Sequence, residues 1–481
     1  MEEIETILKL NNKLLTKKEK NLLERAYAFA QKAHEGQKRD SGEARFNHVF
    51  EAAKNLAKMD VSVTMVAAGL LHDSIENTGV TKKQLLKEFG EEIVLMVDGV
   101  TKLSKIKYKG PEHSVENLRK FFLASAKDIR VVIIRLADRL NNLQTLRYKT
   151  PEKQKNLALE TIEIHARLAD RLGIGKLKGE LEDAAFPFAY PKEYKLVNKI
   201  IKRKQSIYEG YLLRISRKLK NELKKRGVKV FEMSNRLKHK YSLYQKLVKY
   251  DMDIEKVYDI VSLRIVVNTI EECYAALGVI HSIYNPLPGR IKDYISLPKL
   301  NGYRSLHTTI FTGWGGIVEI QIRTKEMNAE AYYGIATRFA YKENAKGKII
   351  NNKKFKWIEE LKKLKYHPED QDSLSENLKM DFFNSCIYVF TPRGDVLDLP
   401  EDSTPLDFAY SIHSDLGDHT YGARINGKII QLFTKLKNGD IVEIVKKKET
   451  HPSSKWLEHV KTSVAKKHIK SYLEKGVLPI K

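Results

Sequence analysis

The sequence contains very little cysteine and no long apolar segment. Only Cys273 and Cys386 occur among 481 residues, which excludes a disulfide framework, and no Cys/His group has the spacing of a zinc site. No run approaches the ~18–20 apolar residues that a membrane-spanning helix needs. The first residues, MEEIETILKLNNKLL, are acidic and amphipathic and contain no apolar signal core. These absences favour a protein of the reducing cytoplasm with no membrane partner.

Negative charge is scarce relative to positive charge. The chain carries 86 Lys and Arg against 61 Asp and Glu, a formal net charge of +25. Such an excess favours polyanionic partners such as nucleotides, RNA or a ribosome surface. Lysine-rich exposed helices, which are common, would explain the same excess without a partner. The length predicts roughly three domains, at about 150 residues each.

Apolar residues at three- and four-residue spacing predict almost continuous helix over residues 20–180. Within this region lie His48, the pair His72-Asp73 and Asp138. Imidazole and carboxylate together suit Mn²⁺, Fe²⁺ or Zn²⁺, and a bound metal would activate water for attack on a phosphate ester. A histidine at an apolar helix end is more often a hydrogen-bonded core residue, so the pattern alone leaves both interpretations open.

Spacing predicts that further polar residues lie beside these histidines and carboxylates. His72 and Glu76 are four residues apart, which predicts a shared helix face. Asp138, Asn142 and Thr145 follow at i, i+4 and i+7, again on one predicted face.

The stretch Pro286–Thr309 is rich in proline and glycine, so most of it is not predicted as regular helix. It gathers two cations, a carboxylate, an amide, an aromatic ring and an imidazole: Arg290, Lys292, Asp293, Asn301, Tyr303 and His307. Taken alone, this composition fits a solvated basic loop as well as it fits a surface that grips a phosphorylated aromatic ligand.

The sequence around this stretch predicts a nucleotide site. A basic helix is predicted at 192–226 and ends at Gly227, and a second helix would align Lys238, Ser242 and Lys246, with Arg236 just before its start. Two cations and a hydroxyl in one stripe suit a triphosphate, although an ordinary solvated lysine face would look the same.

Two β-rich segments, 257–267 and 317–324, predict strands. Asp259 lies at the start of the first, and Glu319, Gln321 and Arg323 share one face of the second. Carboxylates on neighbouring strands would make the two-carboxylate Mg²⁺ site that phosphoryl-type transfer requires.

The motifs HDSIENT, VDGVTKL and RLADRLNNLQTL resemble the hydrolase domain of the RelA/SpoT family, whose bifunctional members make and destroy guanosine tetra- and pentaphosphate, (p)ppGpp. The resemblance implies an all-helical HD-type domain. It implies that Mn²⁺ is held by His48, His72, Asp73 and Asp138, that the nucleotide contacts Arg39, Ser41, Asn142 and Thr145, and that Glu76 helps to position the attacking water.

The chain departs from the family pattern at Asn77, where an aspartate is usual after the glutamate. Asparagine cannot take a proton from water as a carboxylate can. The segments around His48 and around Asn141-Asn142 also differ from the usual sequence motifs of the family, while all four implied metal ligands are present. The resemblance therefore implies a metal-binding hydrolase with a reduced rate.

The middle of the chain resembles the synthetase domain of the same family, which implies a mixed sheet related to polymerase-β-like nucleotidyltransferases. The implied reaction moves the β,γ-pyrophosphate of ATP to the 3′-hydroxyl of GTP or GDP and releases AMP. Asp259 would bind Mg²⁺, and Glu319 would bind Mg²⁺ or act as general base. Phosphate and nucleotide contacts are implied for Arg236, Lys238, Ser242, Lys246, Arg264, Arg290, Lys292, Asn301, His307, Gln321 and Arg323, with Tyr303 stacking on guanine. The residues Arg290-Ile291-Lys292-Asp293 match the RxKD pattern of bifunctional members.

The C-terminal part alternates short strands and turns, with hairpin-type signals at Arg393-Gly394 and Asn438-Asp440. VFTPRGDVLDLP, DFAYSIH and NGDIVEIV resemble a TGS domain, a small β-grasp fold, and 454–473 resembles the helix that follows it. In ribosome-linked members this domain approaches tRNA, which makes deacylated tRNA and the ribosome possible partners through His413. A structural core role for His413 is an equal alternative. Long-form members continue further, so the resemblance implies a C-terminally shortened form.

The predicted organisation is multidomain, α and α+β. It comprises a helical domain at 1–180, a synthetase domain at 181–345, a basic helix and linker at 346–383, a TGS domain at 384–447 and a C-terminal helix at 448–481. Three functions remain open: a bifunctional (p)ppGpp synthetase/hydrolase, a Mn²⁺-dependent hydrolase with a weak synthetase, and a non-catalytic tRNA- or ribosome-binding protein. The sequence indicates no particular oligomeric state.

Overall fold

The structure is a computed structural model that describes residues 2–10, 15–104, 128–299, 301–313, 316–337 and 386–476. It divides into two compact units, one built mainly from residues 1–110 and 117–364 and the other mainly from 365–481. The predicted basic helix and linker at 346–383 lies outside the described residues. Each unit is described by itself below.

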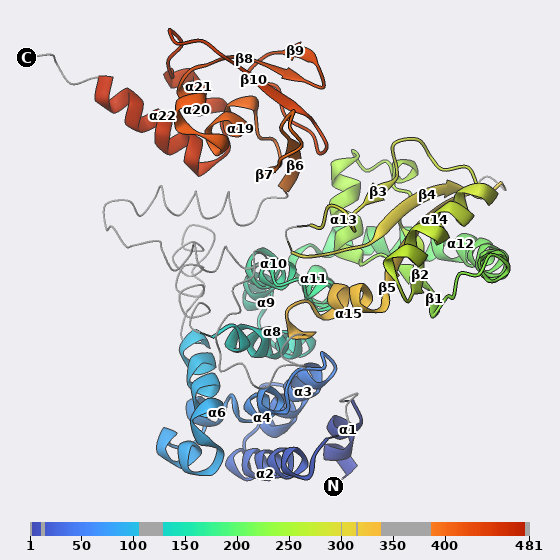
Figure 1. Cartoon of the computed structure of the whole chain (residues 1–481). Coiled ribbons are helices and arrows are strands. Elements are labelled where there is room, and N and C mark those ends of the chain that lie inside the picture. The colour runs from blue at the N-terminus through green and yellow to red at the C-terminus, as the bar shows by residue number, and fades with distance from the viewer. Residues whose placement is uncertain are drawn as a thin grey trace, which may run out of the picture. The chain divides into compact units, whose positions relative to one another are not determined.

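The first half of the larger unit is helical, as predicted. Its elements are α1 (Glu2–Leu10), α2 (Lys17–Ala33), α3 (Arg45–Ala57), α4 (Val63–Leu71), α5 (Ser74–Asn77), α6 (Lys82–Ser104), α8 (Ile129–Gln144), η2 (Leu146–Tyr148), α9 (Pro151–Glu160), the π-helix η3 (Thr161–His165), α10 (Ala166–Arg171) and α11 (Gly175–Ala189). The core lies between α3, α4 and α8, whose apolar faces are almost fully buried (Figure 1).

The predicted shared helix face of His72 and Glu76 is wrong. Helix α4 ends with His72 as its C-cap residue, and Glu76 lies on the separate short helix α5, beyond a break at His72-Asp73. The break turns the chain where the His-Asp pair lies, and Glu76 is exposed to solvent.

The second half of the larger unit contains a mixed five-stranded sheet. Its elements are α12 (Pro191–Lys225), β1 (Glu232–Leu237), α13 (Lys240–Lys249), η4 (Ile254–Lys256), β2 (Val261–Val267), α14 (Ile270–Ile283), β3 (Lys292–Asp293), β4 (Leu306–Phe311), β5 (Ile317–Thr324) and α15 (Lys325–Tyr333). The strand order is β1-β2-β5-β4-β3, in which only β2 and β5 run parallel. Helices α12 and α14 pack against the sheet and against each other (Figure 1).

Strand β5 has the predicted bounds and the predicted alternation. Val318, Ile320 and Ile322 are fully buried on one face, while Glu319 and Gln321 share the other face, where the Gln321 amide donates to Glu319 over 2.9 Å. The long basic helix also ends as predicted, with Gly227 at a φ of 79° in the left-handed region that glycine adopts most easily.

Two predicted boundaries in this half are wrong. The strand predicted from 257 begins at Val261, so Asp259 lies in the segment that precedes β2. The helix predicted to align Lys238 with Ser242 and Lys246 begins only at Lys240. Lys238 therefore lies between β1 and α13, and Arg236 belongs to strand β1.

The smaller unit combines two small sheets with short helices. Its elements are β6 (Cys386–Phe390), β7 (Val396–Pro400), α19 (Pro405–Ile412), α20 (Ser414–Asp418), β8 (Thr420–Ile425), β9 (Lys428–Ile430), β10 (Val442–Lys446), α21 (Ser454–His459) and α22 (Ser463–Gly476). β6 and β7 pair as a hairpin across Arg393-Gly394, as predicted. The hydrophobic core of this unit, between sheet and helix, contains Val389, Leu399 and Phe408.

Two further expectations for this unit are wrong. Asn438-Asp440 forms a turn but does not join paired strands, because β10 pairs with β8 rather than with β9. The single helix predicted at 454–473 is two helices, α21 and α22, separated at Val460–Thr462. The separation has a cause in the fold, since the Asp407 carboxylate accepts hydrogen bonds from the backbone N–H groups of Lys461 and Thr462.

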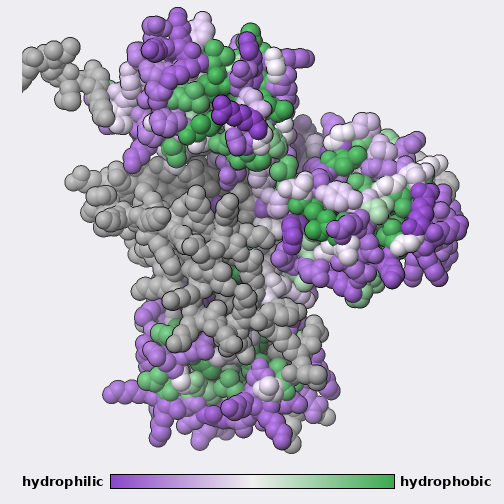
Figure 2. Space-filling view, in the orientation of Figure 1, coloured by the Kyte–Doolittle hydropathy of each residue, from purple (hydrophilic) through white to green (hydrophobic). Residues whose placement is uncertain are grey.

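The predicted fold class, a helical domain followed by a mixed-sheet domain and a small β domain, is confirmed. Within the described residues, no helix combines the length and the apolarity needed to cross a bilayer. Hydrophilic residues cover most of the described surface that faces the viewer in Figure 2, with smaller apolar patches between them.

Candidate functional sites

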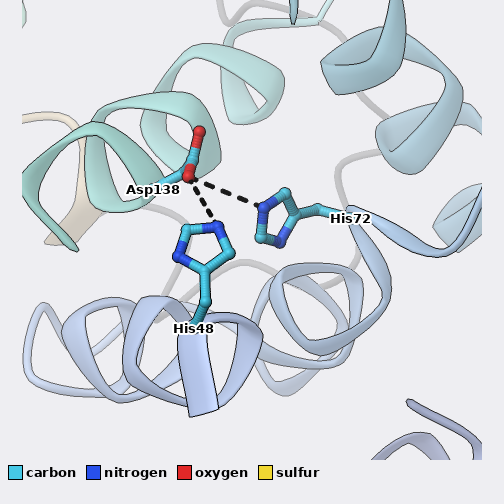
Figure 3. A group of neighbouring side chains, drawn as sticks. All are labelled: His48, His72 and Asp138. Carbon is cyan, nitrogen blue, oxygen red and sulfur yellow. Dashed lines mark ion pairs between the residues drawn. The ribbon is translucent and has the colours of Figure 1, made fainter. Parts of the chain in front are cut away.

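The first site is a buried cluster of His48, His72 and Asp138, whose donor atoms all lie within 4.8 Å of one another. The three side chains come from α3, from the end of α4 and from α8, and they point toward one another (Figure 3). Asp138 Oδ1 lies 3.1 Å from His48 Nε2 and 3.7 Å from His72 Nε2. Three helices thus bring together residues that are up to 90 positions apart in the sequence.

Asp73 supplies a second carboxylate beside this cluster. Its Oδ1 lies 3.3 Å from His72 Nε2, and its Oδ2 lies 3.9 Å from His48 Nε2 and 3.6 Å from Arg45 Nε. The structure therefore brings all four predicted ligands together, and the break after α4 is what turns Asp73 toward the histidines.

Neighbouring groups set which nitrogen of each imidazole faces the cluster. His48 Nδ1 donates to Asn141 Oδ1 over 2.6 Å, and His72 Nδ1 donates to the Gly69 carbonyl over 2.8 Å. Both Nε2 atoms are consequently directed at the carboxylates. A ligating histidine usually donates its other N–H to an acceptor of this kind.

The donor set fits a metal ion of the Mn²⁺, Fe²⁺ or Zn²⁺ type. His72 Nε2 is buried and has no hydrogen-bond partner. Because buried polar atoms rarely lack a partner, this nitrogen is available to bind a metal ion. Burial alone would raise the pKa of Asp138, but the charge of Arg135 and the neighbouring imidazoles of His48 and His72 lower it well below 3.8. Burial opposes protonation of His72, yet the charges of Asp73 and Asp138 raise its pKa to about 9. A cation would replace that proton.

Some of the residues predicted to contact the hydrolase nucleotide lie at this cluster. Arg39 donates to Asn142 Oδ1 over 2.6 Å, and the Asn142 amide donates to Asp138 Oδ1 over 2.7 Å. Thr145 is the C-cap residue of the same helix, α8. Ser41 instead lies 3.4 Å from Glu43 on the preceding loop.

Asn77 lies at the end of α5, one turn after Asp73, and its N–H donates to the Asp73 carbonyl over 2.9 Å. Its own carbonyl accepts from Gln37 over 2.8 Å. These backbone contacts hold α5 against the segment before α3.

The second site lies on the polar face of the mixed sheet. Glu319 on β5 is opposite Ser262 on the parallel strand β2, and Asp259 comes three residues before Ser262, so both carboxylates lie at the same end of the two strands. Asp259 Oδ2 accepts from Lys238 over 2.6 Å and from Lys246 over 2.5 Å. Its Oδ1 is buried without a hydrogen-bond partner, which fits a ligand oxygen for a divalent cation.

Glu319 is the end of a hydrogen-bonded chain that includes Tyr303 and His307. His307 Nδ1 lies 3.2 Å from Glu319 Oε1, and His307 Nε2 accepts from the Tyr303 hydroxyl over 2.8 Å. Burial lowers the pKa of His307. Burial alone would raise the pKa of Glu319, but hydrogen bonds from His307 and Gln321 and the charge of Lys246 lower it to about 2. Both ring nitrogens of His307 thus have protein partners.

Three predicted arginines form a cationic cluster on the same face. Arg264 and Arg323 both face the ring of Tyr332, at 5.0 Å and 5.7 Å from its centroid, and Arg236 donates to Gln321 over 3.4 Å. Burial and the charges of Arg264 and Arg236 lower the pKa of Arg323 to about 10. Because the three guanidiniums repel one another, a polyanion would be bound strongly here.

The described part of the stretch 286–309 is loop except for the two-residue strand β3 and the start of β4, as its composition predicts. Arg290 lies over the ring of Tyr258, at 5.5 Å from the centroid, and Lys292 is exposed. The Asn301 amide donates to Asp170 Oδ1 over 3.2 Å. Asn301 therefore connects the loop to the helical half of the unit.

Several residues with clear structural roles at these sites were not predicted. Asn141 is adjacent to the predicted Asn142, so the doubled asparagine was an available signal. Arg135, one turn before Asp138 on α8, pairs with that carboxylate. Tyr332 contacts two of the arginines from α15, and nothing in the local sequence indicates that contact.

In the smaller unit, His413 is exposed, so the alternative that it is a core residue is wrong. It is the N-cap residue of α20, and its Nδ1 accepts from the Asp415 N–H over 3.2 Å. The rest of its ring is open to solvent.

Three family models match the chain in order. The HD domain model matches residues 26–175, the model of the region found in RelA / SpoT proteins matches 235–346, and the TGS domain model matches 387–446. The first contains the His/Asp cluster, the second contains both carboxylates of the sheet site, and the third contains His413.

Long relatives match almost the whole chain. A guanosine-3′,5′-bis(diphosphate) 3′-pyrophosphohydrolase from Aquifex aeolicus is 44% identical, over 94% of this chain and 64% of the relative. A GTP pyrophosphokinase from Myxococcus xanthus is 41% identical, over 94% of this chain and 60% of the relative. A guanosine-3′,5′-bis(diphosphate) 3′-pyrophosphohydrolase from Vibrio cholerae is 39% identical, over 96% of this chain and 66% of the relative. The chain thus spans 60–66% of the length of these relatives. With HD, synthetase and TGS regions in that order, the chain belongs to the RelA/SpoT family.

Proposed function

We propose that this chain both synthesises and hydrolyses (p)ppGpp. The observation that carries the proposal is the presence of two separate polar sites in one unit, each with its complete set of predicted carboxylates. Relatives of similar identity are named for either activity, a pyrophosphohydrolase in one case and a GTP pyrophosphokinase in another.

For hydrolysis, His48, His72, Asp73 and Asp138 would hold Mn²⁺. When bound, the ion would supply a Lewis acid for the 3′-pyrophosphate and lower the pKa of the attacking water. Asn141 and the Gly69 carbonyl orient the imidazoles, so that both Nε2 atoms would be available to the ion. Arg39, held by Asn142, would bind a phosphate oxygen.

For synthesis, the side chains of Lys238, Lys246 and the arginine cluster would bind the polyphosphates. Opposite charge is needed because two polyanionic substrates must approach each other. Asp259 and Glu319 would bind Mg²⁺. A carboxylate with a pKa near 2 is a weak base at neutral pH, which favours the metal-ligand role of Glu319 over that of general base. Tyr303 would stack on guanine while its hydroxyl holds His307.

The test uses purified protein in two assays. One contains labelled ATP with GDP or GTP and Mg²⁺, and the other contains labelled ppGpp and Mn²⁺. Pyrophosphate transfer in the first and release in the second are expected. Pyrophosphate release without transfer, even with ribosomes and tRNA present, would indicate a Mn²⁺-dependent hydrolase. If neither reaction occurs, the protein would be a non-catalytic binding protein.

A second proposal concerns the TGS domain, which would contact deacylated tRNA and, through it, the ribosome. The exposed imidazole of His413 supports it, because a solvent-facing aromatic ring can stack on an unpaired base. Stimulation of synthesis by ribosomes with deacylated tRNA, lost in His413→Ala but kept in the neighbouring control Ser411→Ala, would support this contact. Equal stimulation of both variants would contradict it.

A further inference from the structure

Helix α11 presents two adjacent carboxylates to the first turn of α13. Asp183 Oδ1 accepts from the backbone N–H of Tyr241 over 3.0 Å, and Asp183 Oδ2 lies 2.9 Å from His239 Nδ1. Glu182 Oε2 accepts from the Ser242 hydroxyl over 3.2 Å. Three contacts thus join α11 to the start of α13.

Helix α13 lacks an N-cap side chain of its own. Its N-cap residue is His239, which makes no side-chain hydrogen bond to the first turn. The first N–H groups of a helix have no partner within the helix, and an aspartate that accepts from one of them also interacts favourably with the helix dipole. Asp183 supplies this cap from another helix, 58 residues earlier in the chain.

Close packing holds the two helices at this position. A Cβ atom added at Gly179 of α11 would lie 2.2 Å from His239 Nε2, so only glycine allows the imidazole to reach Asp183. Two turns after Gly179, the ring of Phe186 contacts those of Tyr241 and Tyr244, with centroid distances of 5.3 Å and 5.4 Å. The same helix α11 also packs against α8 and α9 of the helical half.

The first turn of α13 leads directly to residues of the synthetase site. Ser242 lies in that turn, and Lys246, one turn later, reaches Asp259 over 2.5 Å. A shift or fraying of the first turn would move Lys246 away from Asp259, and it would move both side chains away from any phosphate that they bind.

We propose that Asp183 is a positioning residue of the synthetase, which caps α13 from α11 and thereby holds Ser242 and Lys246 in place for the phosphates of ATP. The proposal rests on the proposed function, in which α13 binds ATP, and adds a residue outside the synthetase motifs to it. Asp183 lies on α11, outside the residues 235–346 that the RelA / SpoT model matches.

The first measurement is binding of a non-hydrolysable ATP analogue with Mg²⁺ to the full chain, which does not depend on turnover. Asp183→Ala is expected to raise the dissociation constant about 5- to 10-fold, the scale of losing one helix cap. The KM for ATP should rise similarly, while the KM for GDP and Mn²⁺-dependent ppGpp hydrolysis stay at wild-type values. Glu180→Ala, on the same helix, is the matched control and should leave ATP binding unchanged.

The decisive variant restores the cap on α13 itself. Serine is a favoured N-cap residue, so His239→Ser in the Asp183→Ala background should supply the missing acceptor and return ATP affinity to within about twofold of the wild type. A purely structural loss at α11 would not be repaired by a cap on another helix. An Asp183→Ala variant with unchanged ATP affinity, or a double variant without recovery, would overturn the proposal. If the wild type itself binds no ATP analogue, the result would contradict the proposed synthetase function, and not only the role of Asp183 as a helix cap.

Discussion

At the scale of single residues, the most informative departure from the family pattern is Asn77. It lies one turn after the metal-cluster residue Asp73 and is bonded to it through the backbone. An amide there cannot accept a proton from water, whereas a carboxylate could.

We therefore expect Asn77→Asp to increase Mn²⁺-dependent ppGpp hydrolysis by about 100-fold, the lower end of general-base assistance. Initial rates of pyrophosphate release measure the effect, with synthesis as the internal control. Asn47→Asp, on the exposed side of α3, serves as a control for added charge. An unchanged rate in Asn77→Asp would mean that this position does not limit hydrolysis.

A second residue-scale prediction concerns acid stability. The folded pKa of Glu319 is about 2 and its ordinary value is 4.5, so its stabilising contribution is present above pH 4.5 and is lost as the pH falls toward 2. The shift corresponds to roughly 3 kcal/mol at neutral pH.

Denaturant unfolding from pH 7 to pH 3 tests this value. Glu319→Gln should be less stable than the wild type at pH 7, and the difference in unfolding free energy should shrink below pH 4.5. Glu232→Gln, at an exposed position of β1, is expected to follow the wild type throughout. A difference that is constant with pH would contradict the low pKa of Glu319.

At the scale of elements, a single buried carboxylate explains why the C-terminal segment forms two helices. Asp407 Oδ2 caps α19 through Thr404, and Oδ1 accepts from the Lys461 and Thr462 N–H groups and from the Thr462 hydroxyl. One side chain thus holds the start of α19 and the α21–α22 junction together.

Asp407→Asn is expected to destabilise the smaller unit by about 2–4 kcal/mol, because an amide cannot accept all of these hydrogen bonds and turns a donor toward buried donors. Hydrogen exchange in α22 of the full chain measures the loss, and exchange in α8 should not change. Asp415→Asn at an exposed position is the control. Full protection of α22 in Asp407→Asn would contradict this role.

At the scale of the whole molecule, the described parts of the two sites share no residue. The His/Asp cluster is built from α3, α4 and α8, and the carboxylates of the sheet site belong to β5 and the segment before β2. The sites should therefore be separable by substitution.

Glu319→Gln is expected to lower (p)ppGpp synthesis by at least about 100-fold, as for the loss of one electrostatic group at a transfer site, and to leave hydrolysis intact. His72→Ala should have the opposite effect and should also lower the affinity for Mn²⁺, measured by calorimetry. Loss of both activities in either variant would contradict separate sites.

The sequence predicted local features well because they depend on local physics. Alternation determined β5 with its polar face, and the three- and four-residue apolar spacing determined the helical half. Element boundaries were predicted less well, because contacts with distant residues decide them. Helix α4 ends where the chain turns His72 and Asp73 toward the His/Asp cluster, and α22 begins where Asp407 accepts a hydrogen bond from Thr462.

By itself, the sequence predicted which residues would carry the chemistry, because recognisable local patterns contain His48, His72, Asp73, Asp138, Asp259 and Glu319. Only the tertiary structure decided what surrounds them. Asn141 sets the tautomer of His48, His307 connects Tyr303 with Glu319, and Asp183 caps a helix 58 residues away. These contacts depend on where distant segments meet, and hydrogen bonding over a few ångströms leaves no periodic pattern in the chain.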